Sequence, residues 1–125
     1  MVPFAVAGDA IPEPLGGHRG DPQRGRLIAL DREVANCLAC HRVPEPAERF
    51  QGELGPDLAG VGRRLTEGQI RLRIVDQSRV NPRTIMPPYH RVDGLRRGAE
   101  KLRGRPALAA AEVEDAVDYL ASLRE

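Results

Sequence analysis

Large aromatic side chains are scarce in this chain of 125 residues, which contains no Trp, two Phe and two Tyr. Such rings bury a large apolar area each and dominate the energetics of most cores. The apolar fraction is nevertheless ordinary, at 41%. The scarcity of rings is therefore easier to understand if a bound flat, apolar group supplies part of the buried volume.

The sequence also lacks a long apolar run and a charge excess of one sign. No segment approaches the roughly 20 apolar residues of a membrane-spanning helix, so we predict no membrane span. A formal net charge of +1 gives no general attraction to nucleic acid, and we expect no nucleic-acid partner. The apolar stretch from Val2 to Ala7 is too short for a signal sequence, so we expect the chain to begin near the start of the mature protein.

Cysteine is equally rare, and both cysteines fall within one run, Cys37-Leu38-Ala39-Cys40-His41. The C-x-x-C-H spacing is typical of covalent c-type haem attachment. Two thiols this close can form thioether bonds to the two vinyl groups of one porphyrin, and the adjacent imidazole then lies beneath the iron. The motif predicts one haem c bound covalently by Cys37 and Cys40, with His41 as the proximal iron ligand.

Three other uses of these residues stay open from the sequence. A zinc site would need both thiolates, His41 and one further ligand, either His18 or His90. A thioredoxin-like motif would need a β-α-β context, for which the sequence gives no sign. A structural disulfide between Cys37 and Cys40 is the simplest alternative. We favour haem because structural zinc sites more often use two separated pairs of ligands.

Met86 is the candidate for the second axial ligand of the iron. It is the only methionine after Met1, and the prolines that follow it, Pro87 and Pro88, stiffen the backbone. A methionine that only fills core space is the alternative, and His90 is the second candidate ligand. Ligation by histidine and methionine raises the reduction potential of the iron relative to ligation by two histidines, and it leaves no open position on the iron. This ligand pair predicts a one-electron carrier.

Glycine and proline divide the chain into short segments. Residues 1–20 are predicted to form an irregular arm laid over the surface, and residues 21–125 a single domain. A first helix is expected from about Pro22, after Asp21 as N-cap, toward the cysteine motif. Three apolar residues, Leu27, Leu30 and Val34, fall at helical spacing along it.

The rest of the chain predicts two further helices separated by loops over 42–65 and 78–109. Thr66 and Gln69 form a possible capping box for a helix from about Glu67 to Gln77. The last helix carries an apolar stripe of Val113, Ala116, Val117, Leu120 and Leu123. No alternation typical of strands is found. We predict a small all-α domain with about three main helices and long loops.

The segment Gly55-Pro56-Asp57-Leu58 resembles the proximal loop of class I cytochromes c. An ordinary Gly/Pro turn is the alternative. The resemblance implies that the Pro56 carbonyl oxygen accepts a hydrogen bond from His41 Nδ1, which fixes the ring and increases its donor strength. Pro56 is therefore a further candidate residue of the haem site.

The class I cytochrome c resemblance also implies that the first and last helices cross closely. A small residue on the first helix, Gly25 or Ala29, is expected to face Tyr119 or Ala116 on the last one.

With these residues assembled, the chain resembles the SoxX family, the small monohaem cytochrome c subunits of the sulfur-oxidation (Sox) complex. The similarity runs from about Gly25 to Leu123. Its most discriminating part is Asn81-Pro82-Arg83-Thr84-Ile85-Met86-Pro87-Pro88-Tyr89-His90-Arg91, because generic cytochromes c rarely continue from the methionine into Tyr-His-Arg. The departure from the expected pattern is Ala109-Ala110, where a hydroxyl cap should precede the last helix.

The resemblance implies a periplasmic heterodimer with a SoxA-type catalytic cytochrome subunit. Such pairs oxidatively couple thiosulfate to a cysteine of a SoxYZ-type carrier protein, and this chain would relay the electrons to a small acceptor. Both of its cysteines are used for haem, so we expect no catalysis by this chain alone, only within an L-cysteine S-thiosulfotransferase-type complex. The alternative function is a free-standing monohaem electron carrier.

A cluster of basic residues follows Met86. It is expected to be either solvated surface or a patch near the haem edge that docks a partner or attracts an anionic substrate. Its members are Arg91, Arg96, Arg97, Lys101, Arg103 and Arg105.

Overall fold

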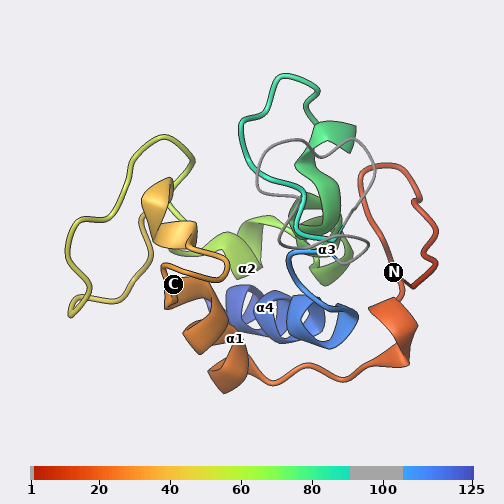
Figure 1. Cartoon of the computed structure of the whole chain (residues 1–125), viewed down its shortest axis with the longest axis horizontal. Helices are drawn as coiled ribbons and strands as arrows, with labels where there is room; N and C mark the ends of the chain where they lie inside the picture. Colours follow the sequence, from red (N-terminus) through yellow and green to blue (C-terminus); the bar gives the residue numbers. More distant parts are fainter. Residues whose placement is uncertain (1, 91–105) are drawn as a thin grey trace.

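The computed structural model describes residues 2–90 and 106–125, and the elements of this part are helical (Figure 1). The α-helices are α1 (Pro22–Leu30), α2 (Val61–Arg64), α3 (Glu67–Asp76) and α4 (Ala110–Ser122), and the 3-10 turns are η1 (Leu15–Gly17), η2 (Cys37–Ala39) and η3 (Gln77–Arg79). Within the described ranges there is no strand, only an isolated bridge between Ala7 and Ala10. The expected all-α class is confirmed. No described helix has the length and apolar character needed to cross a membrane.

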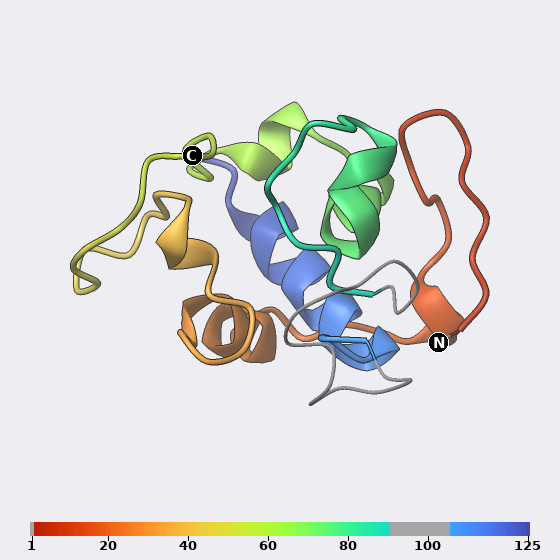
Figure 2. The same ribbon diagram turned by 45° about the horizontal axis from the view of Figure 1, so that its top comes forward.

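Helix α1 packs across α4, and Gly25 lies at the point of contact (Figures 1 and 2). A Cβ added to Gly25 would lie 1.9 Å from the Asp115 carbonyl oxygen and 2.8 Å from Tyr119 Cβ. One turn later, Ala29 is buried in the core. The expected contact between a small residue of the first helix and the last helix is confirmed.

The first helix is shorter than expected, and its apolar residues do not share one buried face. Helix α1 ends at Leu30, so that Val34 lies beyond it and is 42% exposed, and the side chain of Leu27 is 65% exposed. The close approach of α1 to α4 leaves Leu27 outside, because it turns Gly25 and Ala29 inward. The spacing that placed Val34 in the helix was wrong.

The N-terminal arm is irregular apart from η1, and two of its side chains belong to the core. Ile11 and Leu15 are buried, and both contact a buried ion pair between α3 and α4. In this pair, Arg71 Nε and Nη2 each donate to a Glu114 carboxylate oxygen at 2.8 Å. Arg71 Nη1 donates to the Ile11 carbonyl oxygen at 2.8 Å, and Leu15 N donates to Glu114 at 3.1 Å. The arm therefore helps to satisfy the two buried charges.

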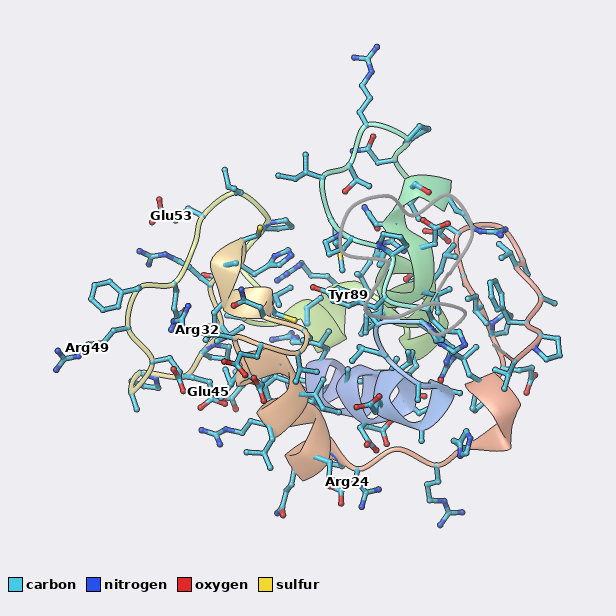
Figure 3. All side chains as sticks on the ribbon, viewed as in Figure 1. Arg24, Arg32, Glu45, Arg49, Glu53 and Tyr89 are labelled. Atoms are coloured by element: carbon cyan, nitrogen blue, oxygen red, sulfur yellow. The ribbon has the colours of Figure 1, made fainter. Side chains whose placement is uncertain are left out.

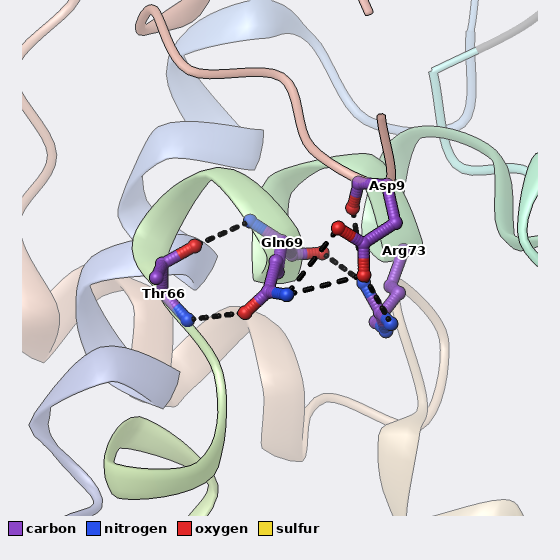
Figure 4. A network of polar contacts seen from close by, with 4 residues as sticks. All are labelled: Asp9, Thr66, Gln69 and Arg73. Carbon is purple, nitrogen blue, oxygen red and sulfur yellow. Dashed lines mark hydrogen bonds and ion pairs between the residues drawn. The ribbon is translucent and has the colours of Figure 1, made fainter. Parts of the chain in front are cut away.

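The capping box expected at the start of α3 is present and also holds the arm (Figure 4). Thr66 Oγ1 accepts from Gln69 N at 3.1 Å, and Gln69 Oε1 accepts from Thr66 N at 2.9 Å. Gln69 Nε2 also donates to the Asp9 carboxylate, which forms an ion pair with Arg73 at 3.3 Å. Asp9 thus joins the arm to the exposed side of α3.

The expected loop over 42–65 differs from the prediction. The segment 42–65 includes the short helix α2, where Gly62 lies against the Ala121 carbonyl oxygen of α4. Helix α4 begins after Ala109 without a side-chain cap, and Glu112 Oε1 accepts from the Ala109 N–H at 2.8 Å instead.

The basic cluster from Arg91 to Arg105 lies outside the described residues.

Replacing Gly25 with Ala tests the helix crossing. Helix propensity alone favours Ala over Gly by about 1 kcal/mol. At this crossing the added Cβ meets the α4 backbone, so we expect the free energy of unfolding to fall, by about 1–3 kcal/mol. Denaturant unfolding measures it, with Gln23→Ala at an exposed position of α1 as the control. A stabilising Gly25→Ala would contradict the described packing.

Candidate functional site

The cysteine motif folds into one tight helical turn. Asn36 begins this turn with a left-handed φ of 51°, a conformation that asparagine tolerates better than most residues. Within the turn, Cys40 N and His41 N donate to the Cys37 carbonyl oxygen at 3.3 and 2.9 Å. Cys37 and Cys40 are not joined by a disulfide. The turn thus brings both thiols and the imidazole into one short segment.

The loop that follows the motif lies with its backbone directly on this turn. Gly52 N donates to the Leu38 carbonyl oxygen at 2.7 Å, and Gly55 N donates to the Cys40 carbonyl oxygen at 2.6 Å. A Cβ on Gly52 would lie 2.1 Å from the Ala39 carbonyl oxygen. Glycine is therefore required for this approach, which fixes the conformation of the motif.

His41 is held in one orientation by the same loop. Its Nδ1 lies 2.7 Å from the Pro56 carbonyl oxygen, which is the hydrogen bond implied by the resemblance to class I cytochromes c. Because a carbonyl oxygen only accepts, Nδ1 carries the proton and Nε2 keeps its lone pair. Gly55 packs against the ring, since a Cβ there would lie 2.3 Å from His41 Cε1. The ring is thus prepared to act as a ligand through Nε2.

His41 and Met86 line the same internal cavity. Its volume is about 350 Å³, within the range of ligand sites in proteins, and its wall is mostly apolar. The wall includes Ala29, Leu58, Val61, Leu65, Ile70, Ile74, Leu108, Ala116 and Leu120. A second hollow of about 340 Å³ is lined by His41, Met86 and both cysteines. Because Cys37, His41 and Met86 line both hollows, the four predicted haem-binding residues lie around one site.

Tyr89 anchors the segment that follows Met86. Its hydroxyl donates to the Ala35 carbonyl oxygen, just before the cysteine motif, and its N–H donates to the Ile74 carbonyl oxygen at 3.1 Å. Burial raises the pKa of Tyr89, so the hydroxyl stays protonated as a donor. The side chain lies inside the molecule (Figure 3) and lines the cavity. Sequence reasoning gave Tyr89 no role in the site, although it is one of only two tyrosines.

Comparison with solved structures finds a match over nearly the whole chain. This chain resembles one in the "Crystal structure of SoxXA from P. pantotrophus" with a TM-score of 0.89 and 32% sequence identity, covering 98% of this chain and 95% of that one. The chain belongs to the SoxX family. It is a cytochrome subunit of a Sox complex with a class I cytochrome c-like fold. No protein-family model and no curated protein matches the sequence.

The zinc alternative finds little support in this SoxX-family chain. Zinc binds thiolates, but burial raises the pKa of the Cys37 thiol to about 11. His18 lies in the arm beside Gly16, and the buried His90 Nδ1 bonds to the Leu108 carbonyl oxygen at 2.8 Å. Among the described residues, no group of three or more His, Cys, Asp and Glu side chains is placed to hold a metal ion. His90 also lines neither hollow, which leaves Met86 as the better placed of the two candidate ligands.

Replacing Gly55 with Ala should displace the His41 ring. The added Cβ would overlap the imidazole, and we expect a loss of about 1–3 kcal/mol in the free energy of unfolding. Chemical denaturation of the purified protein measures this loss. Leu54→Ala, at the exposed neighbouring position, is the control and should change stability by less than about 0.5 kcal/mol. Equal effects of the two substitutions would show that Gly55 does not support His41.

Proposed function

We propose that this chain holds one covalent haem c and is the electron-transfer subunit of a thiosulfate-oxidising SoxXA-type complex. The observation that carries the proposal is the cavity shared by His41 and Met86, next to the two cysteines of the motif. An imidazole nitrogen with a free lone pair and a thioether sulfur are the axial ligands of electron-transfer cytochromes c.

The residues of the site fit a haem. Cys37 and Cys40 would form the two thioether bonds, which leave both sulfurs uncharged, in keeping with the burial that disfavours a Cys37 thiolate. His41 and Met86 would hold the iron from two different loops. The apolar wall of the cavity suits a porphyrin face, and this added volume accounts for a core built with so few aromatic rings.

A haem bound in this way supplies a one-electron couple at its iron. The residues of this chain that surround the iron would orient and protect it. The Pro56 carbonyl oxygen holds His41 in one tautomer and strengthens it as a donor. Tyr89 fixes the end of the methionine loop against the motif, so that Met86 stays at the cavity. With Met86 as a ligand, the iron would have no open position for small molecules, which favours electron transfer over ligand binding.

The partner is a SoxA-type cytochrome subunit in this proposal, in keeping with the two-part name of the matched structure, SoxXA. Coupling thiosulfate to a carrier cysteine forms an S–S bond and releases one proton and two electrons. We assign that chemistry to the partner, because Cys37 and Cys40 are both used for haem. This chain would take the electrons one at a time and pass them to a small acceptor in the periplasm, with a SoxYZ-type carrier as a transient partner.

Reconstitution with the second subunit tests this function. Thiosulfate and the thiol carrier protein are added to the oxidised chain, and reduction is followed by its α-band absorbance. We expect reduction only when the second cytochrome subunit is present, and none when the acceptor cysteine of the carrier is replaced by Ser. Reduction at the same rate without the second subunit would favour a free-standing carrier and contradict the proposal.

A further inference from the structure

Phe50 lies on the loop over residues 42–60, which projects from the body of the molecule between the cysteine motif and α2 (Figure 1). Its side chain is 89% exposed, although Tyr89 and Tyr119 are buried and Phe4 packs beneath Arg79. Burying a phenylalanine side chain is favourable by about 1.5–3 kcal/mol. The chain thus leaves one of its few aromatic rings in solvent.

The backbone at Phe50 has an uncommon conformation. Its φ is 58°, in the left-handed region that bulky residues rarely adopt. Residues held in this region cost about 1–3 kcal/mol and are concentrated at functional sites. An exposed aromatic ring and a strained backbone at one position are two independent observations that point to an interaction surface.

The loop holds Phe50 in place through hydrogen bonds on both sides. Gln51 Oε1 accepts from Val43 N at 2.8 Å, and Gln51 Nε2 donates to the carbonyl oxygens of Glu45 and Glu48 at 3.2 and 3.1 Å. Arg32 Nη2 donates to the Arg49 carbonyl oxygen at 2.7 Å (Figure 3). A loop ordered in advance loses little entropy on binding, so its exposed ring is suited to serve as an anchor.

Two other exposed apolar side chains lie beside the proposed haem site. Leu54, further along the loop, is 76% exposed, and Ile85 of the methionine loop is 75% exposed. Both line the second hollow, which His41 and Met86 also line. Phe50 does not line this hollow, so its ring is a separate exposed apolar site on the loop that carries Leu54.

Positive charge predominates beside Phe50. Glu53 is paired with Arg42 at 2.8 Å, whereas Arg49, the neighbour of Phe50, makes no ion pair with the described residues. Glu48 is half-buried and lines a different pocket, together with Arg42. Arg49 points away from the loop into solvent (Figure 3). Unpaired positive charge beside an apolar surface is complementary to a partner with carboxylates around an apolar pocket.

We propose that Phe50 anchors this chain to the second cytochrome subunit of the pair, in an apolar pocket flanked by a carboxylate that faces Arg49. The proposal rests on the proposed function. Aromatic and arginine residues dominate the hot spots of protein interfaces, and permanent complexes are the more apolar ones. A preorganised aromatic anchor therefore fits the permanent subunit better than a transient electron acceptor.

The affinity of the haem-loaded chain for the purified second subunit tests this assignment. Phe50→Asn removes the ring, and Asn tolerates the left-handed φ, so the loop should keep its shape. We expect Kd to rise at least about 30-fold, as for a hot-spot residue. Phe50→Tyr keeps the ring and should stay near the native Kd. Leu27→Gln, at an exposed apolar position on α1, is the matched control and should also leave Kd unchanged.

Two results would overturn the assignment to the second subunit. One is a Kd for Phe50→Asn within about threefold of the native value. If that variant then slows only the reduction of a soluble acceptor, the Phe50 ring serves the acceptor and not the second subunit. The other is an equal loss with Leu27→Gln, which would mean that exposed apolar residues matter in general. Failure of the proposed function is distinguishable, because the native chain would then not be reduced by thiosulfate in the reconstituted system.

Discussion

The contact between the motif turn and the loop that follows it is the constraint on which the site depends. Gly52 and Gly55 let two backbone segments lie against each other, and the Pro56 carbonyl oxygen then reaches His41 Nδ1 at 2.7 Å. The same loop projects outward to Phe50. One segment therefore orients the His41 ring on its inner side and, in our proposal, meets the partner subunit on its outer side.

The helices form a frame around a volume that the protein does not fill with its own side chains. Gly25 allows α1 to lie on α4, and the buried pair of Arg71 and Glu114 joins α3, α4 and the N-terminal arm. Removing one partner of such a pair leaves an unpaired buried charge, which costs several kcal/mol. The helices packed in this way leave an apolar cavity of about 350 Å³, which His41 and Met86 line.

Local signals in the sequence predicted the parts of the structure that depend on near neighbours. The capping box of α3 was recognised in this way, whereas the resemblance supplied the contact of Gly25 with the last helix and the His41–Pro56 hydrogen bond. Helical spacing did not show which face of α1 is buried, because the crossing with α4 decides this and leaves Leu27 exposed. The role of Tyr89 depends on a contact with Ala35, 54 positions earlier, which no local pattern encodes.

The central claim is that His41 and Met86 hold one haem between them. The near-infrared spectrum of the oxidised protein tests it most directly, because a methionine–iron bond gives a charge-transfer band there. We expect this band in the native protein and in Ile85→Ala, an exposed neighbour, and its loss in Met86→Ala. A band that persists in Met86→Ala, or a native protein without one, would show that Met86 does not bind the iron.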